Sequence, residues 1–486
     1  MSGAIARRRW GRRPSPPHVL AALVAGILSA LAATAIQAAP AAPLQLPPVT
    51  RLTLDNGLRL LVAETHEVPL VEFYGMLGAG AAQDPEGKEG LAALTADAIT
   101  RGAGDLSAED FARKVESLGG QLDATAGTDG TIVNGEFLAE DLATGLELLR
   151  SILREPVFAP DEIRRGREAQ LAELLASLED PSTVAEKCFA QFLYGTYPYG
   201  RWVQGTKATV EGLGRGNVRN FYRRWYRPNN LTLAVVGDIK TDDAVARLRE
   251  AFGSWEARPD AVPTRAGLPE PVTTRRVLLV DQPDASQAQI RIGAMGMKRN
   301  DPELLPAQVA NTVLGGGFSS KLVEELRVKR SLTYGASSAF VARLTGGDFR
   351  ISTFSKSPTA VETLALALDV AGAFRREPVD PKMLDKAKSY LVGQFPLRLE
   401  TPEALAARLV EIDFFGLPKD DLETYVPRVA AVTPLVASAA AETHMPAPEQ
   451  VAIVVVGKVS EIQPALEARF GPVRTTTRDA CDGPFK

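Results

Sequence analysis

Two short markers recur along this chain at nearly one spacing, and that repeat limits the fold more than any other feature of the sequence. The tetrapeptide Arg-Glu-Pro-Val occupies residues 154–157 and again 376–379, which lie 222 residues apart. The strand-like segments 233–237 and 453–457 both end in Val-Val-Gly and lie 220 residues apart. A period this long is not that of a solenoid, whose repeats are about 20 to 50 residues long. The spacing therefore predicts a duplicated domain.

Length and composition agree with two globular domains. The 486 residues are 45% apolar and 23% charged, which suits two domains of about 200 residues, each with a full hydrophobic core. The formal net charge of −4 shows no basic excess. Nucleic-acid binding needs such an excess on one surface, so we expect no nucleic-acid partner.

The first 39 residues have the composition of a secretory signal peptide. Arginines at 7–9 and 12–13 precede an apolar run from Val19 to Ile36, and alanines follow at positions 38 and 39. This order of a basic, an apolar and a small-residue segment predicts export and cleavage. We expect a protein secreted across the inner membrane into the periplasm. An uncleaved membrane anchor at residues 19–36 is the alternative.

Export would permit a disulfide bond, and the chain has two cysteines for one. Cys188 and Cys481 are 293 residues apart. Secreted proteins form disulfides where two thiols meet in the fold, and the sequence leaves open whether these two meet.

Each half mixes strand-like with helical segments. Strands are expected at residues 58–62, 70–74 and 231–236 of the first half, and at 277–280 and 451–456 of the second. The apolar periodicity of 142–153 and the Pro-Asp pair at 160–161 predict two consecutive helices.

The alternation of strands and helices is too irregular for a doubly wound sheet, and it favours an α+β fold. Four prolines between residues 256 and 274 mark an extended linker. We therefore expect an N-terminal domain at 47–255 and a C-terminal domain at 275–478.

The histidine inventory argues against a catalytic zinc held by this chain. The three histidines are His18, His66 and His444, and the first lies in the expected signal peptide. His66-Glu67 does not begin an H-E-x-x-H motif, because Leu70 stands at the second histidine position. A catalytic zinc needs three protein ligands, two of them commonly one helical turn apart.

A series of short segments resembles the pitrilysin/insulinase-like zinc peptidases, the inverzincins. They are 52–58, 67–71, 78–80, 87–92 and the Tyr-Arg-Pro-Asn-Asn of 226–230. Together with the duplication, the resemblance covers essentially all of the mature chain. It implies two similar α/β-sandwich domains that face each other across a cleft.

The inverted zinc motif of that family, H-x-x-E-H, is degenerate here. Ala93 and Asp97 stand at its two histidine positions, and Ala96 replaces the glutamate that would activate water. Glu173, 76 positions after Asp97, matches the third ligand of the family. One carboxylate cannot recreate the site, so we expect no metal to be bound by this chain.

The second half retains a different pair from the family pattern. Residues 319–327 are expected to form a helix, and 331–335 to lead into a strand, which places Arg327 and Tyr334 seven residues apart. The resemblance implies that this arginine holds a substrate carbonyl through its fork of donors, and that the tyrosine hydroxyl stabilises an oxyanion. The alternative is structural: Arg327 would complement a helix C-terminus, and Tyr334 would be a strand aromatic.

These observations favour a non-catalytic, substrate-binding partner subunit of a heteromeric periplasmic zinc peptidase that acts on unfolded peptides. The resemblance implies a paralogous H-x-x-E-H subunit that carries the zinc, and a peptide bound in extended form along a strand edge. A structural or assembly scaffold with no role in catalysis is the alternative. An active homodimer is disfavoured, because two copies would still lack the motif.

Overall fold

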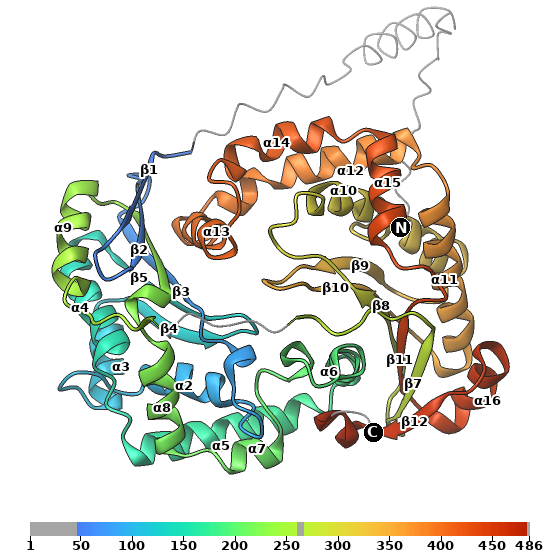
Figure 1. Ribbon diagram of the computed structural model, residues 1–486, viewed down its shortest axis with the longest axis horizontal. Coiled ribbons are helices and arrows are strands. Elements are labelled where there is room, and N and C mark those ends of the chain that lie inside the picture. The colour runs from blue at the N-terminus through green and yellow to red at the C-terminus, as the bar shows by residue number, and fades with distance from the viewer. Residues whose placement is uncertain (1–45, 260–266, 484–486) are drawn as a thin grey trace, which may run out of the picture. The chain divides into compact units, whose positions relative to one another are not determined.

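Two six-stranded sheets, one in each half of the chain, organise the computed structural model (Figure 1). The structure describes residues 46–259 and 267–483. The predicted signal peptide and the alternative anchor at 19–36 lie outside the described residues, as does the middle of the predicted linker. No helix among the described residues is long and apolar enough to cross a membrane.

The first sheet has the strand order β1-β2-β6-β3-β5-β4. Its strands are β1 (Val49–Thr53), β2 (Arg59–Glu64), β3 (Leu70–Leu77), β4 (Gln121–Ala126), β5 (Thr131–Leu138) and β6 (Leu231–Gly237). Strand β2 pairs with β6 in parallel, and the other neighbours are antiparallel.

The second sheet repeats this arrangement with the order β12-β7-β11-β8-β10-β9. Its strands are β7 (Arg276–Asp281), β8 (Ala288–Met295), β9 (Ala336–Val341), β10 (Asp348–Ser355), β11 (Ala452–Gly457) and β12 (Arg474–Thr477). The two Val-Val-Gly segments of the sequence are the equivalent strands β6 and β11, and every residue of both is buried. The predicted α+β fold with two similar, duplicated halves is confirmed. The domain boundaries at 255 and 275 stay predictions.

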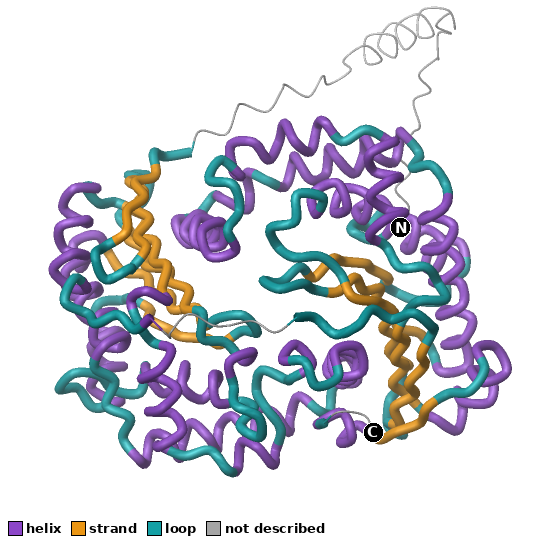
Figure 2. The backbone as a smooth tube through the Cα atoms, viewed as in Figure 1, coloured by secondary structure: helices purple, strands orange, loops and turns teal. Residues whose placement is uncertain are grey.

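Helices account for most of the remaining chain (Figure 2). Those of the first half are α2 (Leu91–Ile99), α3 (Ala108–Ser117), α4 (Leu142–Arg154), α5 (Pro160–Ser177), α6 (Pro181–Tyr194), α7 (Lys207–Glu211), α8 (Arg215–Trp225) and α9 (Thr241–Phe252). Those of the second half are α10 (Leu304–Leu314), a π-helix (Val323–Lys329), α11 (Ala360–Arg376), α12 (Pro381–Gln394), α13 (Pro402–Phe415), α14 (Asp421–Ala431), α15 (Pro434–His444) and α16 (Val459–Phe470). The two Arg-Glu-Pro-Val markers end α4 and α11, since a helix stops at or before the residue that precedes a proline.

The halves exchange one helix each. Helix α6 of the first half packs on β8 and β11 of the second sheet, and α13 of the second half packs on β3 and β6 of the first. Phe189 of α6 lies in one apolar cluster with Val454 of β11, and Leu409 of α13 lies in another with Ala234 of β6. Each sheet is thereby covered on both faces, which explains why the central strands β6 and β11 are buried at every residue rather than at alternate ones.

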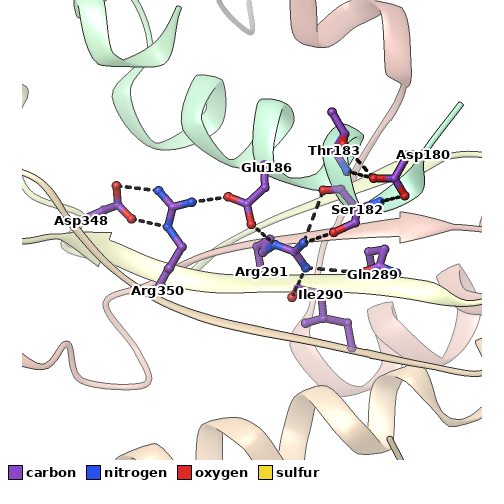
Figure 3. A network of polar contacts seen from close by, with 9 residues as sticks. All are labelled: Asp180, Ser182, Thr183, Glu186, Gln289, Ile290, Arg291, Asp348 and Arg350. Carbon is purple, nitrogen blue, oxygen red and sulfur yellow. Dashed lines mark hydrogen bonds and ion pairs between the residues drawn. The ribbon is translucent and has the colours of Figure 1, made fainter. Parts of the chain in front are cut away.

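A charged network also joins α6 to the second sheet (Figure 3). Glu186 of α6 accepts a 2.5 Å hydrogen bond from Nε of Arg291 on β8 and pairs with Arg350 on β10. Arg350 donates two hydrogen bonds of 2.6 and 2.9 Å to Asp348. The network holds two cations and two carboxylates, so its charges balance within a buried region, as buried charges require.

A disulfide bond connects Cys188 of α6 with Cys481 near the C-terminus. It answers the question that the sequence left open. The bond fastens a helix of the first half to the last described segment of the second half.

Candidate functional site

The degenerate zinc motif lies on α2. The residue before this helix, Gly90, has a left-handed backbone conformation with φ of 93°. Ala96 is buried at 1% exposure. Asp97 accepts a 2.6 Å hydrogen bond from Nε of Arg101 one turn later. A Cβ atom on Gly166 of α5 would lie 2.5 Å from Oδ2 of Asp97, so α5 passes directly beside this carboxylate. The charge of Asp97 is therefore engaged within the fold.

These residues do not fit a zinc ion. Ala93 and Ala96 offer no ligand atom, and Glu173 on α5 is exposed. Nowhere in the described ranges do three His, Cys, Asp or Glu side chains come together as a possible metal site.

Both histidines in the described part of the chain are paired with carboxylates. His66 lies 2.5 Å from Asp238 and 2.9 Å from Glu64. The hydrogen bonds to Asp238 and Glu64 raise the pKa of His66 above its usual value. Nε2 of His444 lies 2.6 Å from Oε2 of Glu303. Both imidazole rings are therefore engaged by carboxylates of the fold.

The structure places Arg327 and Tyr334 together, lining one cavity of about 440 Å³. The π-helix contributes Arg327, and the segment before β9 contributes Tyr334. Tyr334 is 77% exposed, and Arg327 is exposed as well. We name this space the Arg327 cavity; it is lined by Ser182, Gln289, Arg291, Gly315, Gly316, Gly317, Phe318, Val323, Arg327, Tyr334, Gly335, Ala336, Ser337, Ser352, Thr353, Phe354 and Tyr390.

The turn between the two residues starts from an unusual helix end. The helix expected at 319–327 is helical from Lys321, and its residues Val323–Lys329 have π-helical geometry, which occurs frequently at functional sites. Ser331 then takes a left-handed conformation with φ of 54°. Its backbone N–H donates to the carbonyl of Arg327, and that of Leu332 donates to Leu326. This closure reverses the chain, which brings Tyr334 back beside Arg327.

Two buried hydroxyl groups, one from the turn itself and one from β10, fix the backbone beside Tyr334. The hydroxyl of Thr333 and that of Thr353 each donate a 2.9 Å hydrogen bond to the carbonyl of Gly335. The N–H of Gly335 donates back to the Thr333 hydroxyl at 3.0 Å. Both threonines are buried, so the aromatic ring is exposed on a rigid support.

The glycine-rich segment 315–317 forms another wall of the cavity. A Cβ atom on Gly315 would lie 2.3 Å from Oγ of Ser338 on β9, whereas one on Gly317 would meet nothing within 4 Å. Gly315 is therefore needed for close packing. Phe318 follows the glycines and is 89% exposed, so this wall ends in an uncovered aromatic ring.

Part of the lining comes from α6 of the first half and from β8, and reasoning from the sequence missed it. Arg291 is 4% exposed, and its guanidinium donates a 2.8 Å hydrogen bond to the hydroxyl of Ser182 on α6. A charged residue inside the apolar strand Ala288–Met295 was the available signal, since such residues are rarely buried without a partner. Phe318, Thr353 and Tyr390 gave no such signal.

The charged side chains that line the cavity are all positive. Among the described residues that line it, two are arginines and none is acidic. The balanced network with Glu186 takes up the charge of Arg291. Lys329, beside the cavity, pairs with Glu324 at 3.0 Å and with Glu325 at 2.7 Å. Within the described part of the chain the side chains of Arg327 and Tyr334 have no hydrogen bond or ion pair, so both remain able to donate to a ligand.

Comparisons with known proteins agree on one family. Residues 65–207 match the family model described as insulinase (peptidase family M16), and 212–391 match the one described as peptidase M16 inactive domain. An uncharacterized zinc protease of Streptomyces coelicolor is 26% identical over 390 residues, covering 79% of this chain and 85% of that protein. The non-peptidase homolog YmxG of Helicobacter pylori is 25% identical over 378 residues, covering 76% and 85%.

Solved structures show the same architecture. The crystal structure of a peptidase M16 inactive domain from Pseudomonas fluorescens has a TM-score of 0.79 and 25% identity, and it covers 85% of this chain and 98% of that one. The crystal structure of a protease from Helicobacter pylori has a TM-score of 0.78 and 20% identity, with coverages of 85% and 100%.

Proposed function

The chain belongs to peptidase family M16, and we propose that it is a substrate-binding subunit of a heteromeric periplasmic zinc peptidase that acts on unfolded peptides. It is an inactive homologue in the sense that its own motif positions hold Ala93, Ala96 and Asp97. One observation carries the proposal. Arg327 and Tyr334 line a single cavity with their donors unengaged, while the described residues offer no metal site.

In the proposed complex, this chain and its partner subunit would contribute different groups to the reaction. This chain would contribute Tyr334, whose hydroxyl can donate to the oxyanion that forms when water attacks a peptide carbonyl. Arg327 would hold a neighbouring carbonyl of the substrate through its planar fork of N–H groups. The zinc and the general base would come from a paralogous subunit with an intact H-x-x-E-H motif.

The exposure of Tyr334 supports a role completed by a partner. A hydrogen bond to an oxyanion is strongest where water is excluded, and Tyr334 is 77% exposed in the isolated chain. A second subunit seated over the Arg327 cavity would provide that exclusion. The name of the Helicobacter pylori relative, a non-peptidase homolog, agrees with a chain that does not act alone. The periplasmic location rests on the composition of residues 1–39.

The test is peptide hydrolysis by the complex purified from its native host on this chain. We expect activity that a chelator abolishes, and that falls about 100-fold in Tyr334→Phe, the usual loss for one oxyanion donor. Leu435→Ala is the matched control, because Leu435 is 79% exposed on α15 and does not line the cavity. Unchanged hydrolysis by an assembled Tyr334→Phe complex would instead make this chain a scaffold.

A further inference from the structure

We infer that the Arg327 cavity selects peptides that carry an aromatic side chain and an acidic side chain on the same face. This inference rests on the proposed function and names its substrate class. It follows from three properties of the cavity: its aromatic lining, its uncompensated positive charge and its size.

The aromatic lining favours a large apolar side chain. Phe318, Tyr334, Phe354 and Tyr390 all line the cavity, and Phe318 is 89% exposed. An aromatic ring that enters such a space gains buried apolar area and edge-to-face contacts with its neighbours. Rings left uncovered in the isolated chain are surfaces that a ligand can cover.

The charge of the cavity favours a carboxylate. No acidic residue lies among the described lining residues, and Arg327 has no ion pair among the described residues. Arg291 adds fixed donors to the lining of the cavity but no net charge, because Glu186 accepts from its Nε at 2.5 Å. A carboxylate beside Arg327 would form a charge-assisted hydrogen bond, whereas an ammonium group there would be repelled.

The cavity has room for a few neighbouring side chains, and the geometry of an extended peptide sets their spacing. Its volume of about 440 Å³ lies within the range of about 300 to 1,000 Å³ for ligand pockets, which suits neighbouring side chains rather than a folded partner. In an extended peptide, residues i and i+2 point to the same face. The preferred segment therefore has the aromatic and the acidic residue two positions apart.

The experiment measures binding of capped, fluorescently labelled peptides to the full chain by anisotropy. The peptides share one flexible frame and differ at their centre: Phe-Ser-Glu, Phe-Ser-Lys and Ala-Ser-Glu. We expect Phe-Ser-Glu to bind about tenfold more tightly than either of the others, as one charge-assisted hydrogen bond or one buried ring allows.

Two variants locate the preference. Arg327→Gln should remove most of the discrimination between glutamate and lysine, while the matched control Arg330→Gln should keep it, since Arg330 is exposed nearby and does not line the cavity. Phe318→Ala should weaken the Phe peptides and leave Ala-Ser-Glu unchanged.

Equal binding of the Glu and Lys peptides, or no binding of either, would overturn the inference. So would a preference that survives Arg327→Gln. The proposed function is judged separately by the hydrolysis of the Tyr334→Phe complex, which uses no information about peptide charge.

Discussion

The hydroxyl of Thr353 donates a 2.9 Å hydrogen bond to the carbonyl oxygen of Gly335, which connects the residue after Tyr334 to the neighbouring strand β10. Thr353 is 2% exposed, so the bond is shielded from water. The placement of an exposed side chain thus depends on a buried hydroxyl 18 residues further along the chain.

Replacing that hydroxyl should loosen Tyr334. Thr353→Val keeps the shape of the side chain but removes the bond, and we expect a stability loss of about 1 to 2 kcal/mol with reduced peptide hydrolysis by the complex. Thr363→Val is the control, because the Thr363 hydroxyl donates locally, to the carbonyl of Thr359 at the N-cap of α11. Equal loss of activity in both variants would argue against a specific role for Thr353.

The glycine wall gives a prediction with an internal control. Gly315→Ala would place a Cβ 2.3 Å from Oγ of Ser338, whereas Gly317→Ala would meet nothing within 4 Å. We expect Gly315→Ala to lower the free energy of unfolding by about 1 to 3 kcal/mol, as overpacking does, and Gly317→Ala to leave it unchanged. Chemical denaturation of the two variants checks this. Similar midpoints would show that the loop is free to move.

Glu72 should make stability fall as the pH rises. It is 2% exposed on β3, and burial, together with the charges of Glu403 and Glu136, raises its pKa from 4.5 to about 9. Between these values the unfolded chain releases a proton that the folded chain keeps, so unfolding becomes more favourable with increasing pH.

Glu72→Gln, which mimics the protonated form, should therefore exceed the stability of the wild type by less than about 1 kcal/mol at pH 5 and by up to about 5 kcal/mol at pH 8. Urea denaturation at both pH values measures the difference. A gain of equal size at pH 5 and pH 8 would mean that titration of Glu72 is not the cause.

The disulfide should stabilise the contact between α6 and the second sheet. Cys188 and Cys481 are 293 residues apart, and removal of a crosslink across so long a loop costs about 2 to 4 kcal/mol. We expect a reducing agent to lower the denaturation midpoint of the wild type to that of the Cys188→Ala/Cys481→Ala variant. The double variant should not respond to reduction, and a response from it would indicate an unrelated effect.

Metal ions should not change the thermal stability of the isolated chain. Asp97 is bonded to Arg101 at 2.6 Å, and the described residues hold no cluster of three potential ligands. A ligand stabilises a fold only when it binds the folded state, so neither zinc nor a chelator should shift the melting temperature. A rise that saturates at one zinc per chain would show that this chain has its own site.

Local sequence patterns were sufficient to predict the duplication and the principal strands and helices. The repeated Val-Val-Gly segments became the equivalent strands β6 and β11, and the periodicity of 142–153 became α4. Such elements are predictable because apolar periodicity and proline positions act within a few residues. The resemblance to a known family also located Arg327 and Tyr334, which depend on a turn of only a few residues.

Sequence alone therefore determined the family, the duplicated α+β architecture, the loss of the zinc ligands at Ala93 and Asp97, and the loss of the general base at Ala96. Only the tertiary structure decided that α6 covers the second sheet and α13 the first, that Cys188 bonds Cys481, and that Arg291 and Arg327 line one cavity. The residues brought together in these ways lie from 36 to about 340 positions apart in the sequence. They depend on which surfaces remain uncovered once the local elements have formed, and no local pattern of residues encodes that outcome.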